Sequence, residues 1–564
     1  MSAFIQNWPL LCALLLIFNL SLTWLSLVSQ SVPEPYLDEF FHVPQAQKYC
    51  DGDYTWDPKI TTPPGLYLVA KLMKPVFGCS TNSLRALNVL ASCLICFSSF
   101  DILRLLRTPP IQRQDKAGKA KHRQKDGRND SSSFFSLCSD ASTALNVALF
   151  PPLFFFSALF YTDVMSTLAV LLSYNVFLRK KTVSGSLSDN IIAVLVGVIA
   201  LLFRQTNIFW VAVFPAGLAV TAALGGDALS AKSSKPSNAS EVLQQCWKDG
   251  LIHDCAVQDA ASQDYVLLAL TIALATLRKP LLVLRVTVPY IVLLALFASF
   301  VLWNGSVVLG DKSAHTATIH LPQMLYIWPY MAFFSVPLVV GPLLQAIIQP
   351  LPNKIQKLAE RTYLTPGTSS LPDVIISVLF ITGAFLAVHF NTIIHPYTLA
   401  DNRHYVFYVF RILRRHPIIK YLAIPAYYIC AWLVTNALGV PSNDEQALKQ
   451  ERENAGPTNT EARRLPCQAS FLNIWLVTTA LSVVTAPLVE PRYFIIPWII
   501  WRLHVRAASA SLPGKPSSNR NLFDVRLALE MLWSLIINVA IMHTFLYRGF
   551  AWPSELGKVQ RFLW

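Results

Sequence analysis

Long apolar stretches recur along the whole chain, and their lengths carry the first structural information. Segments of about 17 to 25 mostly apolar residues match helices that cross a hydrocarbon core of roughly 30 Å. We place such spans near residues 8–28, 84–103, 143–160, 163–178, 190–203, 207–224, 284–303, 324–348, 372–392, 418–438, 469–489 and 525–547, with shorter candidates at 264–277, 402–413 and 493–505. Because backbone in lipid must satisfy its own hydrogen bonds, the pattern predicts an all-α polytopic membrane protein with about 12 to 14 transmembrane helices.

Composition agrees with a protein whose solvent is the bilayer. Of 564 residues, 54% are apolar and only 14% are charged, and the mean hydropathy is +0.44. A soluble protein has about a quarter of its residues charged. The first span lacks a basic n-region and a cleavage site, so we expect a retained anchor instead of a signal peptide. We expect one polytopic domain over residues 1–564 and no separate soluble domain.

The charge distribution predicts the orientation. Residues 104–128 hold nine Lys or Arg against two Asp, so the loop 104–142 is expected in the cytosol. The first loop, residues 30–83, then faces the opposite compartment. Its segment 30–63 has six acids and two lysines. The basic loop offers no aromatic platform or folded motif, so we expect no nucleic-acid partner. Residues 225–262 and 440–466 look like variable polar loops.

Two of the ten cysteines, Cys50 and Cys79, lie in the first loop. They can pair if that loop faces an oxidising compartment. From the sequence alone we favour separate buried thiols over a disulfide.

Polar residues collect at span ends on the side opposite the basic loop. Charges at membrane depth are costly unless they face one another or a polar cavity, so repeated clusters on one side indicate a shared site. The clusters are PYLDEFFHVPQAQ (35–47) with WDPKITTPPGLY (56–67), FYTD (160–163), FRQTNIFW (203–210), GDKSAHTATIHLPQMLY (310–326), HPYTLADNRHYVFY (395–408) and PLVEPRYFIIP (487–497).

Each cluster alone also has a simpler explanation. Asp38 and Glu39 can cap the following helix, and Arg403 and Arg492 can be snorkelling anchors. The five-residue spacing of two histidines in the GDKSAHTATIH segment does not favour a metal site on one helix face. Six clusters together favour a functional site.

These segments resemble the signature blocks of the endoplasmic-reticulum dolichyl-phosphate-glucose-dependent α-1,2-glucosyltransferases. DEFFHVPQAQ, WDPKITTPPGLY, RQTNIFW, ADNRHY and EPRYF carry the resemblance, which runs from the first loop to the closing RFLW. The polar loops 108–142, 225–262 and 440–466 carry no motif.

The resemblance implies a GT-C type glycosyltransferase in the endoplasmic-reticulum membrane, with its active site facing the lumen. The implied donor is dolichyl phosphate glucose, and the implied acceptor is a diglucosylated, mannose-rich oligosaccharide on dolichyl diphosphate. Transfer would invert a β-linked donor to an α-linked product, as the last step of lipid-linked oligosaccharide assembly for N-glycosylation. We expect membrane lipid as surroundings, no cofactor and no metal.

Inverting glycosyl transfer needs a carboxylate that takes the proton from the attacking hydroxyl. The candidate catalytic acids are Asp38 and Glu39. Asp38 is preferred, because adjacent side chains point in different directions and only one of the two is expected to reach the hydroxyl. Asp163 is the weaker competitor.

The leaving phosphate gains charge, so cations are expected beside it, and arginine suits phosphate through its planar fork. Arg492, Arg403 and Lys312 are the main candidates, with Arg204 as participant or anchor. The remaining predicted substrate-binding residues offer donors, acceptors or flat aromatic faces for sugars and phosphate: His42, Trp56, Asp57, Tyr67, His315, His320, His404, Tyr405 and Glu490.

Three other functions stay open: another dolichyl-phosphate-sugar-dependent transferase, a multi-span transporter, and a noncatalytic scaffold. We see no internal repeat of the kind many transporters have. The topology holds a conflict, because a span at 402–413 would place EPRYF on the cytosolic side. We favour a surface helix there, since twelve residues are short for a span.

Overall fold

The computed structural model describes residues 7–107, 130–180, 182–225, 238–312, 318–348, 350, 352, 374–394, 396–439, 467–486, 488–507, 524–553, 555 and 557–564. Nearly all regular structure in these residues is helical. The loop 440–466 lies outside the described residues, as do residues 108–129 of the basic loop and residues 226–237. Part of the polar stretch 225–262 is a helix, α12 (Ala239–Asp249).

The other elements are named in chain order. The first half contains α2 (Trp8–Ser31), α3 (Glu39–Asp51), α4 (Gly65–Phe77), α5 (Thr81–Arg107), α7 (Asp130–Ala148), α8 (Pro151–Phe155), η1 (Phe156–Ala158), α9 (Thr162–Arg179), α10 (Leu187–Leu201), η2 (Phe209–Val213), α11 (Phe214–Leu224), α13 (Ser262–Arg278) and α14 (Pro280–Asn304). The second half contains α15 (Gln323–Phe334), α16 (Val336–Val339), α17 (Gly341–Ile348), α19 (Val374–Phe390), α20 (Pro396–Ala400), α21 (Tyr405–Leu413), α22 (Ile419–Asn436), α24 (Ala469–Val483), η3 (Pro491–Phe494), α25 (Ile495–His504), α26 (Val525–Tyr547), and the antiparallel pair β1 (Phe550–Ala551) and β2 (Val559–Gln560).

The first helix shows how sequence pattern becomes packing. Apart from Pro9 in the first turn, the buried side chains of α2 recur every three or four residues, as one helix face requires: Leu10, Ala13, Ile17, Ser21, Trp24 and Val28. Leu11, Leu15 and Phe18 on other faces are exposed, as expected for side chains that face lipid. Trp24 donates a hydrogen bond of 2.9 Å from its indole N–H to the carbonyl of Phe155, so this helix is fixed to the chain just before the FYTD segment.

Four helices among the described residues are long and apolar enough to cross a membrane: α2, α5, α14 and α26. The count becomes five if the bent pair 134–148 and 151–158 forms one span. The described structure is therefore a helical protein with membrane-spanning character, and the larger number of 12 to 14 spans stays a prediction.

Two predicted spans are interrupted. The chain bends by 59° between α7 and the helical segment that starts at Pro151, because consecutive prolines remove backbone donors and clash with the preceding turn. The predicted span 324–348 divides into α15, α16 and α17, with breaks at Ser335 and Val340. In both cases the hydrophobic run is continuous while the helix is not.

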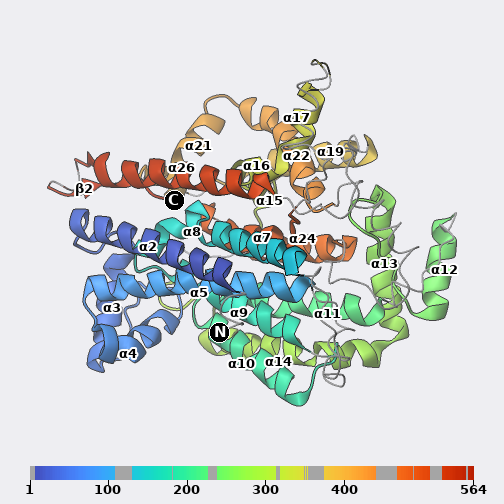
Figure 1. The fold of residues 1–564 in the computed structure, drawn as a ribbon, viewed down its shortest axis with the longest axis horizontal. Helices are drawn as coiled ribbons and strands as arrows, with labels where there is room; N and C mark the ends of the chain where they lie inside the picture. Colours follow the sequence, from blue (N-terminus) through green and yellow to red (C-terminus); the bar gives the residue numbers. More distant parts are fainter. Residues whose placement is uncertain are drawn as a thin grey trace.

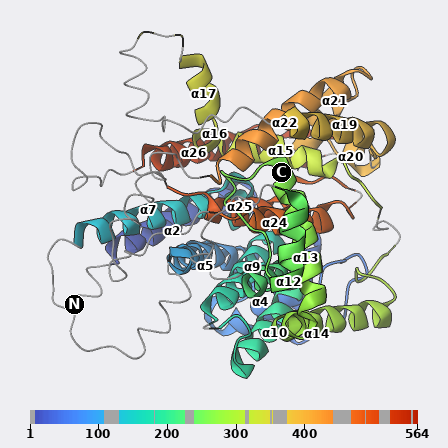
Figure 2. The same cartoon turned by 90° about the vertical axis from the view of Figure 1, so that its right-hand side faces the viewer.

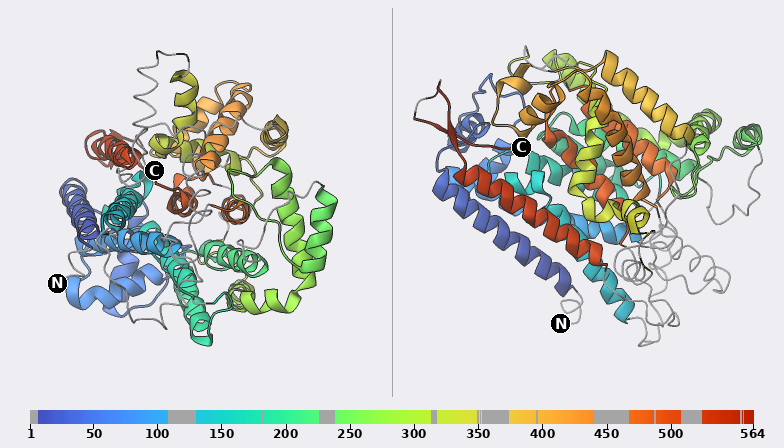
Figure 3. Two further views of the ribbon diagram at one scale, coloured as in Figure 1. Left: turned by 45° about the vertical axis from the view of Figure 1, so that its right-hand side comes forward. Right: turned by 90° about the horizontal axis from the view of Figure 1, so that it is seen from above.

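The helices gather around the middle of the molecule. Figure 2 shows α19, α21 and α22 on one side and α10 and α14 on the opposite side, with α9, α24 and α25 between them. α5 packs against α2, α7 and α9, as Figure 1 shows. In Figure 3, α26 runs beside α2, so the first and the last long helices of the described residues lie on one face.

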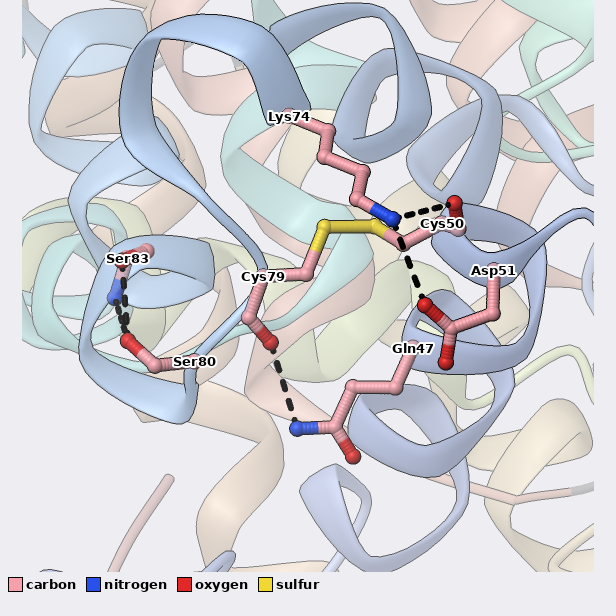
Figure 4. Close-up of a disulfide and its surroundings, with 7 residues drawn as sticks. All are labelled: Gln47, Cys50, Asp51, Lys74, Cys79, Ser80 and Ser83. Atoms are coloured by element: carbon pink, nitrogen blue, oxygen red, sulfur yellow. Dashed lines mark hydrogen bonds and ion pairs between the residues drawn. A yellow bond between two sulfur atoms is a disulfide. The ribbon is translucent and has the colours of Figure 1, made fainter.

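The first loop is cross-linked, contrary to our expectation of separate thiols. Cys50 and Cys79 form a disulfide that joins the end of α3 to the segment after α4 (Figure 4). Lys74 donates to the carbonyl of Cys50 at 2.9 Å, and Gln47 donates to that of Cys79 at 3.2 Å. The prediction failed because spacing along the chain does not show that α3 and α4 fold back on each other as a hairpin.

The segment 402–413 contains only the nine-residue helix α21. At 1.5 Å per residue it is about 13 Å long, less than half of a hydrocarbon core. This length agrees with a surface helix and removes the reason to place EPRYF on the other side of the membrane from the remaining clusters.

Candidate active site

Three segments that are far apart in the sequence meet where their helices begin. The loop after α2 supplies Asp38, and the start of α9 supplies Asp163. The start of η3 supplies Glu490, which immediately precedes it, and Arg492, which lies within it. Arg204, which follows α10, completes the group. We call these five residues the acid–arginine cluster.

Arg492 is the centre of the acid–arginine cluster. Its guanidinium donates to Oδ2 of Asp38 at 2.8 Å, lies 2.9 Å from Oε2 of Glu490, and is 3.7 Å from Oδ2 of Asp163. Arg204 forms an ion pair of 3.0 Å with the other oxygen of Asp163. Three carboxylates thus face two guanidinium groups, which leaves one formal negative charge in a mostly buried site.

Exposure separates the acids. The side chain of Asp163 is 1% exposed and that of Glu490 is 19% exposed, whereas that of Asp38 is 43% exposed. Asp38 is therefore the carboxylate of the cluster that a bound molecule reaches most easily. Its Oδ1 has no hydrogen-bond partner among the described residues.

The charge of Arg492 keeps Asp38 ionised. Burial acts to raise the pKa of Asp38, but the positive charge of Arg492, its hydrogen bond and the nearby histidines outweigh burial, so the net pKa lies below its usual value. The carboxylate of Asp38 stands at the N-cap position of α3 but makes no capping bond. The simpler explanation of this acid as a helix cap therefore does not fit.

Glu39 and Arg85 fix the backbone next to Asp38 on its buried side. Both side chains are fully buried and share two hydrogen bonds, of 2.8 and 2.6 Å. Arg85 also donates to the carbonyls of Val32 and Glu34, while Glu39 accepts from the backbone N–H of Tyr36 at 3.1 Å. We call this arrangement the Glu39–Arg85 clamp.

The Glu39–Arg85 clamp spans a strained residue. Among the described residues other than glycine, only Leu37 has a positive φ, of 51°. Such a conformation costs free energy and persists only where surrounding contacts fix it. Leu37 immediately precedes Asp38, so the contacts of the clamp set the direction of the Asp38 side chain.

Other residues of the first loop form an aromatic wall near Asp38. His42, one turn along α3, has its Nδ1 2.6 Å from the hydroxyl of Tyr67. Trp56 packs against Tyr67 with ring centroids 5.9 Å apart. Asp57 instead shapes its own turn, because its carboxylate accepts from the N–H of Lys59 at 2.9 Å.

Two glycines permit close approaches around this loop. Gly65 donates to the carbonyl of Leu202, and a Cβ on it would lie 2.5 Å from that oxygen. Gly310, with φ of 60°, would place a Cβ 2.3 Å from the carbonyl oxygen of Pro58. These contacts bring the RQTNIFW and GDK segments against WDPKITTPPGLY.

The ADNRHY segment forms a second polar neighbourhood. Arg403 pairs with Asp401 at 2.7 Å and stacks on Trp552 at 4.5 Å. Nδ1 of His404 lies 3.0 Å from the carbonyl oxygen of Trp564, and the ring of Tyr405 is 5.2 Å from that of Trp564. The positive charge of His404, when present, also lowers the pKa of Asp38, so the two neighbourhoods adjoin.

Three predicted residues lie outside both neighbourhoods. Lys312 is exposed and donates to the carbonyl of Asn304. His320 is fully buried, and neither ring nitrogen has a hydrogen-bond partner among the described residues. His315 lies outside the described residues.

Sequence reasoning missed three residues that shape the site. Arg85 lies inside an apolar helix, and a charge in such a place is itself a signal of a buried partner. Tyr161 accepts from the N–H of Asp38 at 3.2 Å, and Tyr36 accepts from the N–H of Arg561 at 2.7 Å. Nothing in the local pattern distinguishes these tyrosines from interface aromatics.

No group of three or more His, Cys, Asp or Glu side chains among the described residues has a geometry that could hold a metal ion. The three acids of the cluster converge on a guanidinium instead. The site thus consists of the acid–arginine cluster and the neighbouring aromatic side chains of the first loop, held by membrane-type helices.

Comparison with known families decides the relationship. The model of the DIE2/ALG10 family matches residues 32–503, from the first loop to the end of α25. The chain belongs to the DIE2/ALG10 family. This confirms the resemblance that the motifs predicted.

Curated relatives of this DIE2/ALG10 protein share the name Dol-P-Glc:Glc(2)Man(9)GlcNAc(2)-PP-Dol alpha-1,2-glucosyltransferase. The one from Aspergillus fumigatus is 40% identical and covers 96% of each chain. Those from Rattus norvegicus and Homo sapiens are 32% and 30% identical, each covering 99% of both chains. An oligosaccharyltransferase structure from Archaeoglobus fulgidus aligns with 86% of this chain and 57% of its own, at 12% identity and a TM-score of 0.27, which supports no argument about the fold.

The Glu39–Arg85 clamp predicts a large stability effect in this DIE2/ALG10 protein. Arg85→Met leaves a buried carboxylate unpaired, so we expect the free energy of unfolding to fall by about 3–5 kcal/mol. Arg179→Met removes the Arg179–Asp101 pair, whose arginine is 57% exposed, and should cost about 0–1 kcal/mol. Equilibrium unfolding in mixed detergent measures both. Equal effects of the two variants would contradict the clamp, as would failure of Glu39→Gln to recover part of the loss in Arg85→Met.

Two buried histidines predict the pH dependence of stability. Burial lowers the pKa of His42 to about 4 and that of His320 to about 4, from an ordinary value of 6.5. The unfolded chain therefore takes up protons below pH 6.5 that the folded chain refuses, so stability should fall as pH drops from 7 toward 4. Thermal unfolding at pH 7, 6 and 5 tests this. His42→Gln combined with His320→Gln should flatten the decline, and an unchanged slope would show the account of these histidines to be wrong.

Proposed function

We infer that the chain transfers glucose from dolichyl phosphate glucose to Glc2Man9GlcNAc2-PP-dolichol in α-1,2 linkage. The relatives that carry this name match nearly the whole chain at 30–40% identity. The structural observation that supports it best is the contact between Asp38 and Arg492. It sets a proton acceptor and a phosphate-binding cation side by side, which are the two groups that this transfer requires.

Asp38 is the proposed base. The acceptor hydroxyl attacks C1 of the donor glucose, its proton passes to the Asp38 carboxylate, and the bond from C1 to the phosphate oxygen breaks. The electron pair of that bond leaves with dolichyl phosphate. Oδ1 is available to the hydroxyl while Oδ2 is held by Arg492, and the lowered pKa keeps the carboxylate ionised at neutral pH.

Arg492 is the proposed phosphate ligand. The leaving phosphate changes from a diester to a monoester and gains a second negative charge, which a fixed guanidinium stabilises more than it stabilises the starting diester. Nε of Arg492 donates to Glu490 at 3.1 Å and Nη1 donates to Asp38 at 2.8 Å, while Nη2 lies 2.9 Å from Glu490. Nη1 also lies 3.7 Å from Asp163, beyond hydrogen-bond distance. We propose that the second N–H groups of Nη1 and Nη2 donate to phosphate oxygens.

Glu39 and Asp163 take supporting roles in this proposal. Both carboxylate oxygens of Glu39 are occupied inside the Glu39–Arg85 clamp, so Glu39 positions the loop and does not act as base. Asp163 is buried between Arg204 and Arg492 and fixes the direction of both guanidinium groups. His42, Tyr67 and Trp56 offer hydrogen bonds and aromatic faces to the sugar.

The proposed setting is the endoplasmic-reticulum membrane, with the cluster on the lumenal side. The Cys50–Cys79 disulfide supports an oxidising compartment for the first loop. The basic loop, residues 104–142, would lie in the cytosol. We propose a GT-C type fold with 12 to 14 spans, in which shorter apolar helices such as α10, α11, α19 and α24 also contribute to the membrane domain.

Activity of purified variants tests the proposal. The wild-type protein should add one hexose to the diglucosylated lipid-linked glycan from dolichyl phosphate glucose but not from UDP-glucose. Asp38→Asn should lower kcat by about 10²–10⁴-fold, the usual contribution of a general base. Glu34→Gln, a neutral substitution of an exposed acid in the same loop, is the matched control and should leave kcat nearly unchanged.

The outcomes separate the alternatives. Folded wild-type protein that transfers nothing from either donor contradicts the assignment and favours a transporter or scaffold. Full activity of a folded Asp38→Asn variant keeps the reaction but moves the base to another acid, with Asp163→Asn as the next test. Transfer from a dolichyl mannose donor instead identifies a related transferase.

A further inference from the structure

The residues Arg561–Trp564, which we call the RFLW segment, contact the first loop from the far end of the sequence. The hydroxyl of Tyr36 accepts a hydrogen bond of 2.7 Å from the backbone N–H of Arg561 and donates one of 2.9 Å to the carbonyl of the same residue. Tyr36 lies two residues before Asp38, the proposed base. The RFLW segment follows β2 and lies outside residues 32–503, which the family model matches, so family membership does not account for this contact.

The RFLW segment is anchored at its start by the side chain of Arg561. The guanidinium donates to the carbonyls of Phe545 and Leu546 at the end of α26, at 2.7 Å each, and to that of Ser31 at the end of α2, at 3.1 Å. Carbonyls in the last turn of a helix have no partner within that helix, so a cation satisfies them and is favoured by the helix dipole. In Figure 1 the mark C lies beside α26. The two long helices thus fix the position of Arg561.

The other end of the RFLW segment pairs with the ADNRHY segment. The backbone N–H of Leu563 donates to the carbonyl of Arg403 at 3.0 Å, and that of Tyr405 donates to the carbonyl of Leu563 at 3.3 Å, which forms a parallel bridge. The side chain of Leu563 is buried. Together with the bonds of Arg561 to the helix ends, this pairing anchors the segment without any help from Tyr36.

Tyr36, by contrast, is the fixed point of the loop that carries the base. Its backbone N–H donates to Glu39 at 3.1 Å, its carbonyl accepts from the hydroxyl of Tyr161 at 3.4 Å, and its own hydroxyl is bonded twice to Arg561. It is followed by Leu37, whose positive φ persists only where neighbouring contacts impose it. Because the RFLW segment stays anchored without Tyr36, the two bonds to Arg561 serve to fix the loop.

We propose that the RFLW segment is a positioning element of the active site, which sets the direction of Asp38 through the hydroxyl of Tyr36. The proposal rests on the proposed function, since it takes Asp38 as the base. The segment acts through Tyr36 and need not touch a reacting atom. It adds a second support to the Glu39–Arg85 clamp, so the direction of the Asp38 carboxylate is set before substrate binds.

Removing one hydroxyl tests the proposal. Tyr36→Phe deletes both bonds to Arg561 but keeps the ring, whose centroid lies 5.7 Å from that of Phe545. Tyr547→Phe is the matched control, because Tyr547 lies at the end of α26 and is 67% exposed. In the full-length protein, kcat and KM for donor and acceptor are measured for each variant, alone and combined with Asp38→Asn.

The expected result is a loss in the chemical step alone. Tyr36→Phe should lower kcat by about 10- to 100-fold, as a small displacement of a catalytic group does, while KM for both substrates stays unchanged. Tyr547→Phe should change neither quantity. Combined with Asp38→Asn, Tyr36→Phe should cause at most about a twofold further loss, because the group that it positions has already been removed.

Three results would overturn the proposal. An unchanged kcat of folded Tyr36→Phe would show that the loop does not need the RFLW segment. A loss that multiplies fully with that of Asp38→Asn would show an effect independent of the base, as from a general loosening of the fold. A raised KM with unchanged kcat would assign the segment to substrate binding.

A second variant and two controls separate these results from loss of folding and from failure of the proposed function. If Tyr36→Phe unfolds early, Arg561→Lys replaces it, because lysine keeps the charge but lacks the planar fork of arginine. The same fall in kcat, without further loss beside Asp38→Asn, is then expected, and its absence overturns the proposal. Full activity of Asp38→Asn alone would contradict the proposed base, and inactive wild-type protein would contradict the proposed function. Either result overturns the proposal at its premise.

Discussion

The placement of one guanidinium group governs the architecture of the site. Arg492 is 11% exposed and faces three carboxylates, the most distant of which, Asp38, is 454 residues away in the sequence. A buried arginine without partners would be strongly destabilising, as would buried acids without it. The end of α2, the start of α9 and the segment after α24 therefore have to converge, and this convergence forms the acid–arginine cluster. The formal excess of one negative charge is tolerated because Asp38 is the most exposed of the three acids and keeps part of its hydration.

The Glu39–Arg85 clamp gives that centre its rigidity. It holds the backbone on both sides of Leu37, the one described residue besides glycines with positive φ. A base whose direction is fixed before the substrate arrives loses little free energy to reorganisation during the reaction. The disulfide at the end of α3 and the tie between Tyr36 and Arg561 hold the same loop at its outer side. Two acids that are adjacent in the sequence thus have different surroundings: Asp38 is partly exposed and contacts Arg492, whereas Glu39 is fully buried against Arg85.

The sequence predicted the helices well where hydrophobic runs were long, as in α2, α5 and α26. It did not predict the bend at Pro151 or the division of the 324–348 run, because mean hydropathy is insensitive to a local break in hydrogen bonding. The motif clusters indicated that Asp38, Asp163 and Arg492 belong to one site. The sequence did not show that Lys312 binds the carbonyl at the end of α14, or that Arg85 binds Glu39. Those contacts depend on how helices pack, which no local pattern encodes.

The most direct test of the account is the structure of the protein with a non-hydrolysable analogue of dolichyl phosphate glucose, determined by electron cryomicroscopy. The account predicts that a phosphate oxygen lies within hydrogen-bond distance of the Arg492 guanidinium, and that C1 of the sugar faces Oδ1 of Asp38 across a space that one hydroxyl fills. A phosphate bound elsewhere, with Arg492 still enclosed by its three carboxylates, would contradict it.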